Sequence, residues 1–339
     1  MTNNLNITLI KETKLILAFL KEYKDKLDAM DKADVQKDAE AYLLTIFPGF
    51  KKTMDEHFSK TSSIFDNIKD KTEYKDNQDY YIKTLWDYLY FPKINKHIYD
   101  KPFGYPGDFV LMNYIIDYQD KFIGESSFEK LINYYSVKSP FCLSNVARKE
   151  YLKSIIISTI SRYKSPGITS VASGSIRELL DISGEHPHIN EFNCIDFEPK
   201  AFEYIKNELK RDSFNNKIKM NFILKDIIKM IKTRDIGSLL KPQDLIYFSG
   251  IFDYLPDRIA KKVFTTFYSL LKDGGTMLIC NCSKKNKKLH SYYEVLGKWE
   301  MIYRDEDDLI DIISDAHVKK HRFDYPKNGK CYNFLVIEK

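Results

Sequence analysis

The chain has 339 residues, of which 43% are hydrophobic and 30% are charged, and it carries a formal net charge of +5. This composition excludes a disordered, a collagenous or a disulfide-stapled protein, and the length suits two domains of roughly 100–200 residues each. The small net charge argues against nucleic acid as a partner, because proteins that bind it usually carry a basic stripe.

The patterns of apolar residues and of cysteines further restrict the class of protein. The apolar runs stay far below the roughly 20 residues that a membrane-spanning helix needs, and the N-terminal sequence lacks the pattern of a signal peptide. The five cysteines are scattered without CxxC pairs, which is typical of reduced thiols. The seven histidines show no metal-ligand spacing, and we interpret His186 and His188 as structural. We therefore expect a cytoplasmic protein without a metal, an integral membrane segment or a nucleic-acid partner.

The first 160 residues predict helices only. Apolar residues within 16–30 recur at spacings of three and four, which places them on one helix face. A second series covers 41–58 and is interrupted by a proline-glycine pair. A third helix covers 80–91 and ends before a proline, which lacks the donor that the next turn needs. A fourth covers 143–163, with Ser144 as its N-cap.

After residue 165, short apolar segments alternate with amphipathic ones. We expect strands at 168–172, 191–197, 218–224, 244–248 and 276–281, and helices at 176–182, 201–209, 257–271 and from 227 onward. This alternation predicts βαβ units and a parallel sheet covered by helices on both faces. The C-terminus differs, because apolar segments at 317–325 and 331–337 flank an Asn-Gly pair. They predict an antiparallel hairpin at the edge of the sheet.

Open parallel sheets bind ligands beyond the carboxyl ends of their strands. The first predicted strand ends in Ala172-Ser173-Gly174, which has one glycine where the dinucleotide fingerprint GxGxxG has three. Gly174 would let a ligand approach the backbone, although an ordinary strand-to-helix turn explains it equally well. The loop leaves little room for a pyrophosphate, which binds to several free amides.

Aspartates follow the next two strands. Asp196, which precedes Phe197, lies 22 residues after Gly174 and suits a pair of ribose hydroxyls. Asp226, which precedes Ile227, is placed to reach an adenine amino group. Each aspartate alone would also suit a helix N-cap or a turn. Together they favour S-adenosylmethionine, which has a ribose, an adenine and a sulfonium cation but no phosphate.

The chain is similar to class I S-adenosylmethionine-dependent methyltransferases over its last 175 residues or so. From about residue 95 it resembles, more narrowly, the bacterial methyltransferases of 3-hydroxypalmitic acid methyl ester biosynthesis. The segments that carry the narrower resemblance are 101–109 (KPFGYPGDF), 250–255 (GIFDYL), 274–275 followed by Asn281, and 299–304 (WEMIYR). The first 90 residues match no family that we can name.

The resemblance implies an α/β fold with a Rossmann-like seven-stranded sheet and a C-terminal antiparallel hairpin. This methyltransferase domain would cover 143–339, an all-helical domain would cover 1–142, and the cofactor would leave as S-adenosylhomocysteine. This chain departs from the motifs of the narrower family at two places. Ala172-Ser173-Gly174-Ser175 stands where that family has Ala-Cys-Gly-Pro, and Tyr105-Pro106-Gly107-Asp108 stands where it has Tyr-Ala-Gly-Asp.

The segment 101–109 contains helix-breaking glycines and a proline and is therefore a loop between helices. With the resemblance, it is a candidate lid over the cofactor that presents Tyr105 and Asp108 as catalytic groups. The alternative is an interhelical turn in which Asp108 caps the helix that begins at Phe109.

Further candidates surround the expected position of the methyl group. Ser249 and Gly250 end the fourth strand, at the place where a class I enzyme holds the transferring methyl. The remaining candidates are Asp253 and Tyr254 on the next turn, Tyr303 and Arg304 as a substrate wall, Asn281 as a catalytic group at the end of the fifth strand, and Arg148 as a partner for a carboxylate. A satisfied strand-end amide is the alternative for Asn281, and surface positions are the alternatives for the arginines and Tyr303. The lysine-rich run 284–288 suits a solvated loop or, less well, a surface that attracts an anionic substrate.

Methyl transfer from a sulfonium is an in-line displacement, so the protein mainly holds the reacting atoms collinear and dry. A carboxylate is ionised at neutral pH and needs no general base, whereas an amine or a phenol does. No histidine ends a strand, which favours the carboxylate of a small lipophilic acid such as a hydroxy fatty acid, free or linked to an acyl carrier. Asp108, Asp253 or Tyr254 would be the base for an amine or hydroxyl of a small molecule or protein. A catalytically idle fold that binds the cofactor or a partner protein is the third alternative.

Overall fold

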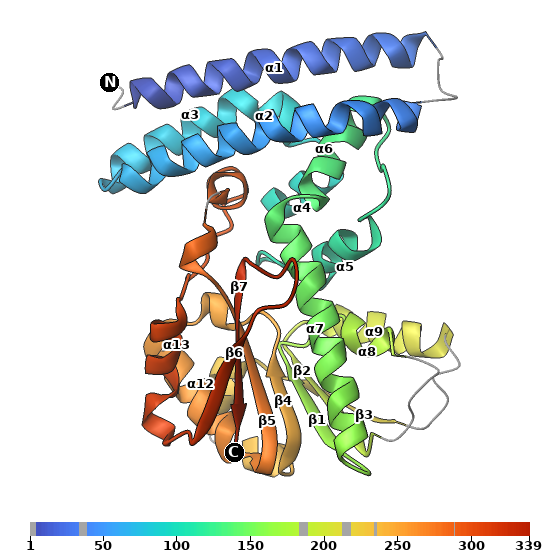
Figure 1. The fold of residues 1–339 in the computed structure, drawn as a ribbon, viewed down its shortest axis with the longest axis vertical. Coiled ribbons are helices and arrows are strands. Elements are labelled where there is room, and N and C mark those ends of the chain that lie inside the picture. The colour runs from blue at the N-terminus through green and yellow to red at the C-terminus, as the bar shows by residue number, and fades with distance from the viewer. Residues whose placement is uncertain (1–4, 34–38, 183–188, 212–217, 234–235, 288) are drawn as a thin grey trace. The chain divides into compact units, whose positions relative to one another are not determined.

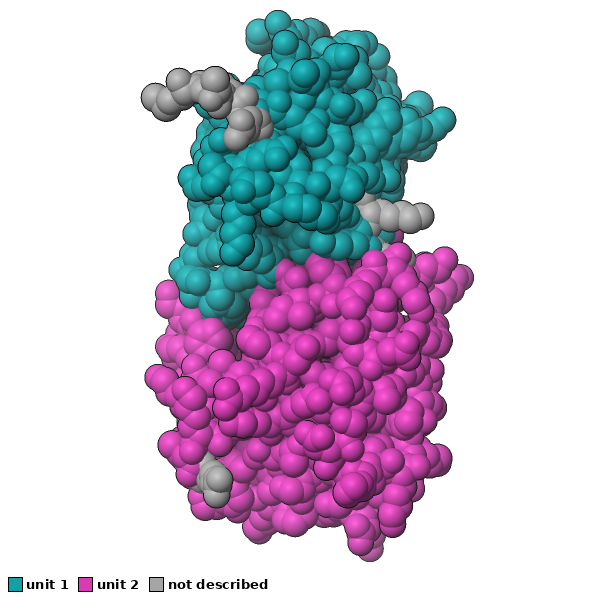
Figure 2. Space-filling model, turned by 90° about the vertical axis from the view of Figure 1, so that its left-hand side faces the viewer, with its two compact units in different colours: residues 1–142, 287–300 teal, residues 143–286, 301–339 magenta. Residues whose placement is uncertain are grey.

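The computed structural model describes residues 5–33, 39–182, 189–211, 218–233, 236–287 and 289–339. The chain forms two compact units, which Figure 2 shows in different colours. A helical unit comprises residues 1–142 and 287–300, and a sheet unit comprises residues 143–286 and 301–339. The sequence-based boundary places 287–300 in the C-terminal domain, whereas this segment packs with the helices. Within the described ranges, no helix is both long and apolar enough to cross a membrane.

The helical unit has no strand among its described residues, as predicted (Figure 1). Its helices are α1 (Ile7–Lys32), α2 (Ala39–Asn67), α3 (Lys71–Leu89), α4 (Lys93–Asp100), α5 (Phe109–Asp117), α6 (Ser127–Val137) and the first residues of α7 (Pro140–Arg162). Helix α2 continues through Pro48, and the apolar residues on both sides of the proline are buried, among them Leu43 and Phe50.

Two helix starts differ from the prediction. Helix α3 begins at Lys71, because the carboxylate of Asp70 accepts hydrogen bonds from the amides of Thr72 and Glu73. Helix α7 begins at Pro140, and Ser144 is therefore not its N-cap. The hydroxyl of Ser144 instead donates to the carbonyl oxygen of Asn328 at 2.9 Å. A proline is well suited to a first helical turn, where no amide donor is needed.

The segment 287–300 enters the helical unit as a buried π-helix, η4 (Ser291–Leu296). Thr61 and Ser62 each share a hydrogen bond with the Ser291 hydroxyl, at 2.9 and 3.0 Å. The Tyr292 hydroxyl lies 2.7 Å from Oγ of Ser136 and donates to Oδ1 of Asn95 at 2.9 Å. Side-chain hydrogen bonds therefore fix this segment within the unit.

The carbonyl oxygens at the end of η4 also have partners. Those of Val295, Leu296 and Gly297 accept hydrogen bonds from Gln78, Tyr90 and Lys101, at 3.0, 2.6 and 2.9 Å. Orphan carbonyls at a buried helix end are costly unless side chains or water satisfy them. Side chains from other parts of the helical unit thus satisfy the carbonyl oxygens at the end of η4.

The sheet unit contains one seven-stranded sheet in the order β3-β2-β1-β4-β5-β7-β6. Its strands are β1 (Gly167–Val171), β2 (Glu191–Asp196), β3 (Lys219–Leu224), β4 (Gln243–Phe248), β5 (Leu271–Cys282), β6 (Lys320–Asp324) and β7 (Tyr332–Glu338). The pairs among β1 to β5 are parallel, and β7 is antiparallel to both β5 and β6. The predicted parallel sheet with a C-terminal antiparallel hairpin is confirmed.

Helices cover both faces of the sheet. The other elements of this unit are α8 (Arg177–Leu180), α9 (Pro199–Arg211), α10 (Ile227–Thr233), α11 (Ile236–Leu239), η2 (Phe252–Tyr254), α12 (Asp257–Ser269), η3 (Lys284–Asn286), α13 (Glu306–Ile313) and η5 (Ser314–Ala316). Side chains of α10 to α13 form one apolar core with Ile246, Ile279 and Leu335. On the opposite face, Phe222 of β3 contacts the ring of α9 residue Phe202, with 5.1 Å between their centroids.

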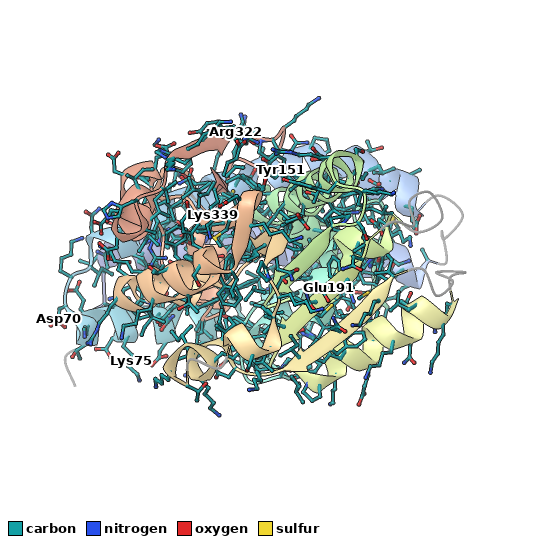
Figure 3. The ribbon with its side chains drawn as sticks, turned by 90° about the horizontal axis from the view of Figure 1, so that it is seen from below. Asp70, Lys75, Tyr151, Glu191, Arg322 and Lys339 are labelled. Atoms are coloured by element: carbon teal, nitrogen blue, oxygen red, sulfur yellow. The ribbon has the colours of Figure 1, made fainter. Side chains whose placement is uncertain are left out.

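Helix α7 packs on the same face as α9, because Tyr151 contacts Phe334, the neighbour of the core residue Leu335, at 5.0 Å between ring centroids. In Figure 3, Tyr151 and Arg322 lie close together. Both side chains donate to the carboxylate of Asp324. Helix α7 is thereby fixed to the edge strand β6.

The buried hydroxyl of Tyr292 provides a test of how the η4 segment is held. Tyr292→Phe removes the hydroxyl from Ser136 and Asn95, and we expect a loss of about 1–2 kcal/mol in the free energy of unfolding. Urea unfolding of the full chain measures it. Tyr325→Phe is the matched control, because Tyr325 is 66% exposed and should change stability little. Equal effects of the two variants would contradict the assigned role.

Candidate functional site

The loop between β1 and α8 has an unusual backbone. Ala172, Gly174 and Ile176 have φ angles of 54°, 54° and 44°. The left-handed region is costly for a β-branched residue such as Ile176. Strain of this kind persists where the surrounding structure fixes it, and it is concentrated at functional sites.

Asp196, the last residue of β2, holds this loop. Its Oδ2 accepts a hydrogen bond from the amide of Gly174 at 2.8 Å, and its Oδ1 accepts one from the amide of Glu198 at 3.0 Å. Burial raises the pKa of the Asp196 carboxyl, and the amides of Gly174, Glu198 and Phe197 oppose this rise. An ionised carboxylate has about four acceptor positions, so about one remains for a ligand beside these three amides. The Gly174 amide, in contrast, is already used and is not offered to a phosphate.

A cavity of about 460 Å³ adjoins the carboxyl ends of β2 and β3. Its lining residues are Phe197, Leu224, Lys225, Asp226, Lys229, Met230 and Thr233. Phe197 and Leu224 are large apolar side chains that are 49% and 54% exposed. Exposed apolar side chains around a concave site are typical of ligand binding, and this volume lies within the usual range for a small molecule.

Asp226 caps α10 and lies at the cavity, while its predicted contact with an adenine amino group stays a prediction. Its Oδ1 accepts hydrogen bonds from the amides of Ile228 and Lys229 at 2.7 and 3.1 Å, which is N-cap geometry, and it also lines the cavity. Ile227 points elsewhere, because its side chain is buried in the apolar core between the sheet and α12. Only the backbone of Ile227 is therefore available to a ligand.

A buried cation lies at the carboxyl end of β4. Arg148 of α7 is 9% exposed, and its guanidinium lies 4.7 Å from the ring centroid of Tyr332. A Cβ atom added at Gly250 would approach Nη1 of Arg148 to 3.1 Å. The absence of a side chain at Gly250 thus leaves space for the guanidinium beside the strand end. The predicted surface alternative for Arg148 is wrong.

Asp253 follows in η2 and is 3% exposed. Its Oδ1 accepts a hydrogen bond from the amide of Cys282 at 2.6 Å. Burial raises the pKa of the Asp253 carboxyl to about 6, and the Cys282 amide and the charges of Arg148 and Arg304 oppose this rise. Asp253 therefore changes its protonation state close to neutral pH.

Arg304 and Asn281 are bonded to each other inside the sheet unit. Arg304 is 2% exposed, and its guanidinium donates to Asp257, to two carbonyl oxygens and to Oδ1 of Asn281. The amide of Asn281 donates in turn to the carbonyl oxygens of Ile302 and Cys282, at 2.8 and 3.1 Å. For Asn281 this is the satisfied strand-end amide that the sequence left open. The prediction of Arg304 as a substrate wall is wrong, because its donors are all used within the protein.

The other predicted residues are distributed over both units. Tyr105 and Asp108 belong to the helical unit, where Asp108 caps α5 through hydrogen bonds from Val110 and Leu111, at 2.9 and 3.0 Å, and lies 2.7 Å from Nε2 of His97. Asp108 is 1% exposed, which favours the capping interpretation. Ser249, Tyr254 and Tyr303 are half-buried in the sheet unit, and the catalytic role of Tyr105 stays a prediction.

The lysine run is largely neutralised. Lys284 and Lys285 pair with Asp308 and Glu306, at 2.6 and 2.7 Å, which favours the solvated-loop interpretation over attraction of an anion. Over the described ranges, no group of three or more His, Cys, Asp and Glu side chains is arranged to hold a metal ion. His186 and His188 lie outside the described residues.

Comparisons with known proteins bear on the fold. No family model matches the chain, and no curated protein sequence matches it. A possible exported protein from Bordetella parapertussis is similar in structure, with a TM-score of 0.54 and 15% identity over 68% of this chain and 79% of that one. The apo form of the S-adenosylmethionine-dependent methyltransferase SibL has a TM-score of 0.46 and 12% identity over 76% and 72%. PigF with SAH has a TM-score of 0.42 and 15% identity over 77% and 71%.

The strand order and the antiparallel β7 decide the fold class. The fold is that of the class I methyltransferases. The cavity residues Leu224, Lys229 and Met230 and the Arg304 network were missing from the sequence-based set. The position of Leu224 at the end of a predicted strand, close to Asp226, was a signal for the cavity, since such strand ends face the ligand edge.

The raised pKa of Asp253 gives a testable dependence of stability on pH. Because the folded protein holds this proton more tightly than the unfolded chain, stability falls as pH rises from about 4 to about 6. Asp253→Asn removes this loss. The free energy of unfolding of the variant should therefore rise relative to the wild type across this window, by at most about 3 kcal/mol.

Urea unfolding between pH 4 and 7 measures the difference. Asp273→Asn is the control, because Asp273 is exposed, and it should show no such trend. A difference for Asp253→Asn that is independent of pH would contradict the assigned titration.

Proposed function

We propose that this chain is an S-adenosylmethionine-dependent methyltransferase. The observation that carries the proposal is the Asp196 carboxylate, which is held against the Gly174 loop beside a cavity flanked by Phe197. In a class I fold an acidic group at the end of β2 accepts hydrogen bonds from the ribose hydroxyls. The cavity between Phe197 and Met230 offers apolar surfaces to an adenine ring.

The Gly174 loop beside this cavity suits a cofactor without phosphates. The Gly174 amide is committed to Asp196, so the loop lacks the row of free amides that binds a pyrophosphate. When bound, S-adenosylmethionine supplies an electrophilic methyl group on a sulfonium. The residues of this chain would orient the cofactor and exclude water from the reacting atoms.

The cofactor site is tested by calorimetric titration of the full chain with S-adenosylmethionine and S-adenosylhomocysteine. We expect micromolar binding of both, and Asp196→Ala should weaken it at least tenfold, because the ribose loses its acceptor and the Gly174 loop loses its anchor. Glu203→Ala is the matched control, since Glu203 is an exposed acid on α9. Wild-type affinity in the Asp196 variant would refute the proposed ribose site.

We propose further that the acceptor is the carboxylate of a small lipophilic acid, such as a hydroxy fatty acid. Arg148 supports this acceptor, because a buried guanidinium beside Gly250 recognises a carboxylate by paired hydrogen bonds. The carboxylate oxygen would form a bond to the methyl carbon while the carbon–sulfur bond breaks and its electron pair stays on sulfur. No proton moves in this step, so no general base is required.

Arg148 variants test the acceptor. With 3-hydroxypalmitate as acceptor, Arg148→Gln should lower kcat/KM at least a hundredfold, and Arg148→Lys should lower it less, because the charge is kept while the paired geometry is lost. S-adenosylmethionine affinity should change less than threefold. Arg162→Gln on the same helix is the control, since Arg162 is exposed. Unchanged acceptor kinetics in Arg148→Gln would exclude this role, and a product stable to mild alkali would exclude an ester.

Asp253 supports a second candidate function. A carboxyl group whose pKa is raised to about 6 by burial is a suitable general base near neutral pH. An amine or hydroxyl acceptor on a small molecule or protein would use such a base. In that case Asp253→Asn would abolish methyl transfer, whereas the carboxylate acceptor requires no base.

A further inference from the structure

Arg304 has an unusually complete set of hydrogen bonds. Nη1 donates to the carbonyl oxygen of Phe252 at 2.7 Å and to Oδ1 of Asn281 at 2.8 Å. Nη2 donates to the carbonyl oxygen of Leu255 at 2.5 Å and to Oδ1 of Asp257 at 2.6 Å. Nε donates to the same Asp257 oxygen at 3.0 Å. The five N–H groups of a guanidinium are thus all used.

We propose that Arg304 is a positioning residue that fixes the segment 249–257, from the end of β4 to the first residue of α12, at the carboxyl end of the sheet. Three of its acceptors lie on this segment, at Phe252, Leu255 and Asp257. The segment carries Gly250 and Asp253, which lie beside the buried Arg148. The consequence for catalysis rests on the proposed function, whereas the positioning itself does not.

Arg304 is itself hydrogen-bonded to the sheet, so it can hold the segment at a fixed position relative to the strands. Its amide donates to the carbonyl oxygen of Cys282 on β5 at 2.9 Å, and its own carbonyl oxygen accepts from Nδ2 of Asn333 on β7 at 2.7 Å. Two residues earlier, the amide of Ile302 donates to the carbonyl oxygen of Asp253 at 2.7 Å. The contact with the segment is therefore made by the backbone as well as by the guanidinium.

The shape of the guanidinium explains why arginine stands here. Its planar fork reaches acceptors in several directions, whereas a lysine ammonium offers three donors at one point. Two of the acceptors are backbone carbonyl oxygens that are buried and would be costly to leave without a donor. A lysine at this position would keep the charge but lose part of the hold on the segment.

The pKa of Asp253 is a second measurable quantity that depends on the charge of Arg304. The carboxyl of Asp253 is faced by Arg148 of α7, Arg304, Cys282 of β5 and, from β7, Tyr332. The charge of Arg304 opposes the effect of burial on the pKa of Asp253. Loss of that charge should therefore raise this pKa further.

The test compares Arg304→Lys and Arg304→Gln with Arg322→Lys, which alters an arginine on β6 that bonds Asp324 and Glu338. Hydrogen–deuterium exchange of the full chain should increase at least tenfold within 249–257 in both Arg304 variants, with β1 and β2 unchanged. The titration of Asp253, followed by carboxyl NMR, should move to higher pH in Arg304→Gln, which removes the charge, and less in Arg304→Lys, which keeps it. With 3-hydroxypalmitate, kcat should fall at least tenfold in both.

Unchanged exchange within 249–257 in folded Arg304 variants would overturn the proposal, and so would an unmoved Asp253 titration in Arg304→Gln. Should neither Arg304 variant fold, hydrogen–deuterium exchange of the Asp257→Asn variant tests the proposal instead. This substitution weakens two of the five hydrogen bonds at an exposed acceptor, and it must raise exchange in the segment for the proposal to stand. Failure of the wild type to bind S-adenosylmethionine would refute the proposed function, while the exchange and titration experiments would still test Arg304.

Discussion

The need to compensate charges buried at the carboxyl edge of the sheet determines how this site is built. A charge removed from water is costly unless hydrogen bonds or an opposite charge stabilise it. Backbone amides of the Gly174 loop and of the end of β5 stabilise Asp196 and Asp253, and carbonyl oxygens surround Arg304. Each charge thereby joins two neighbouring segments of the chain. The hydrogen bonds that stabilise these buried charges therefore also hold the surrounding backbone in place.

Much of the sheet unit was predictable, because each signal is local. Alternation of short strands with amphipathic helices gave the parallel sheet, and the Asn-Gly pair gave the C-terminal hairpin. The 22-residue spacing between Gly174 and Asp196 predicted a pair that the fold joins by a hydrogen bond. The sequence is informative where residue type and strand position alone decide the outcome.

The rest depends on partners far apart in the chain. Nothing in the local sequence distinguishes an exposed arginine from Arg304, whose acceptors lie about fifty residues earlier and at Asn281. Asp108 illustrates the same limit, since a capping aspartate and a catalytic one follow the same glycine-rich turn. The sequence does not decide which unit the segment 287–300 joins, because its tyrosines would suit the core of either one. The hydrogen-bond partners of the Tyr292 hydroxyl lie in the helical unit.

The π-helical segment makes the chain pass between the two units three times, at 142/143, 286/287 and 300/301. Neither unit is therefore encoded by one uninterrupted stretch. A fragment that begins at residue 143 would carry Tyr292 and Tyr293 without the helices that bury them, and the remaining fragment would lack part of its own interior. For this protein, modular dissection at the apparent boundary would yield two incomplete bodies. Recombination that keeps both units intact would have to take account of all three boundaries.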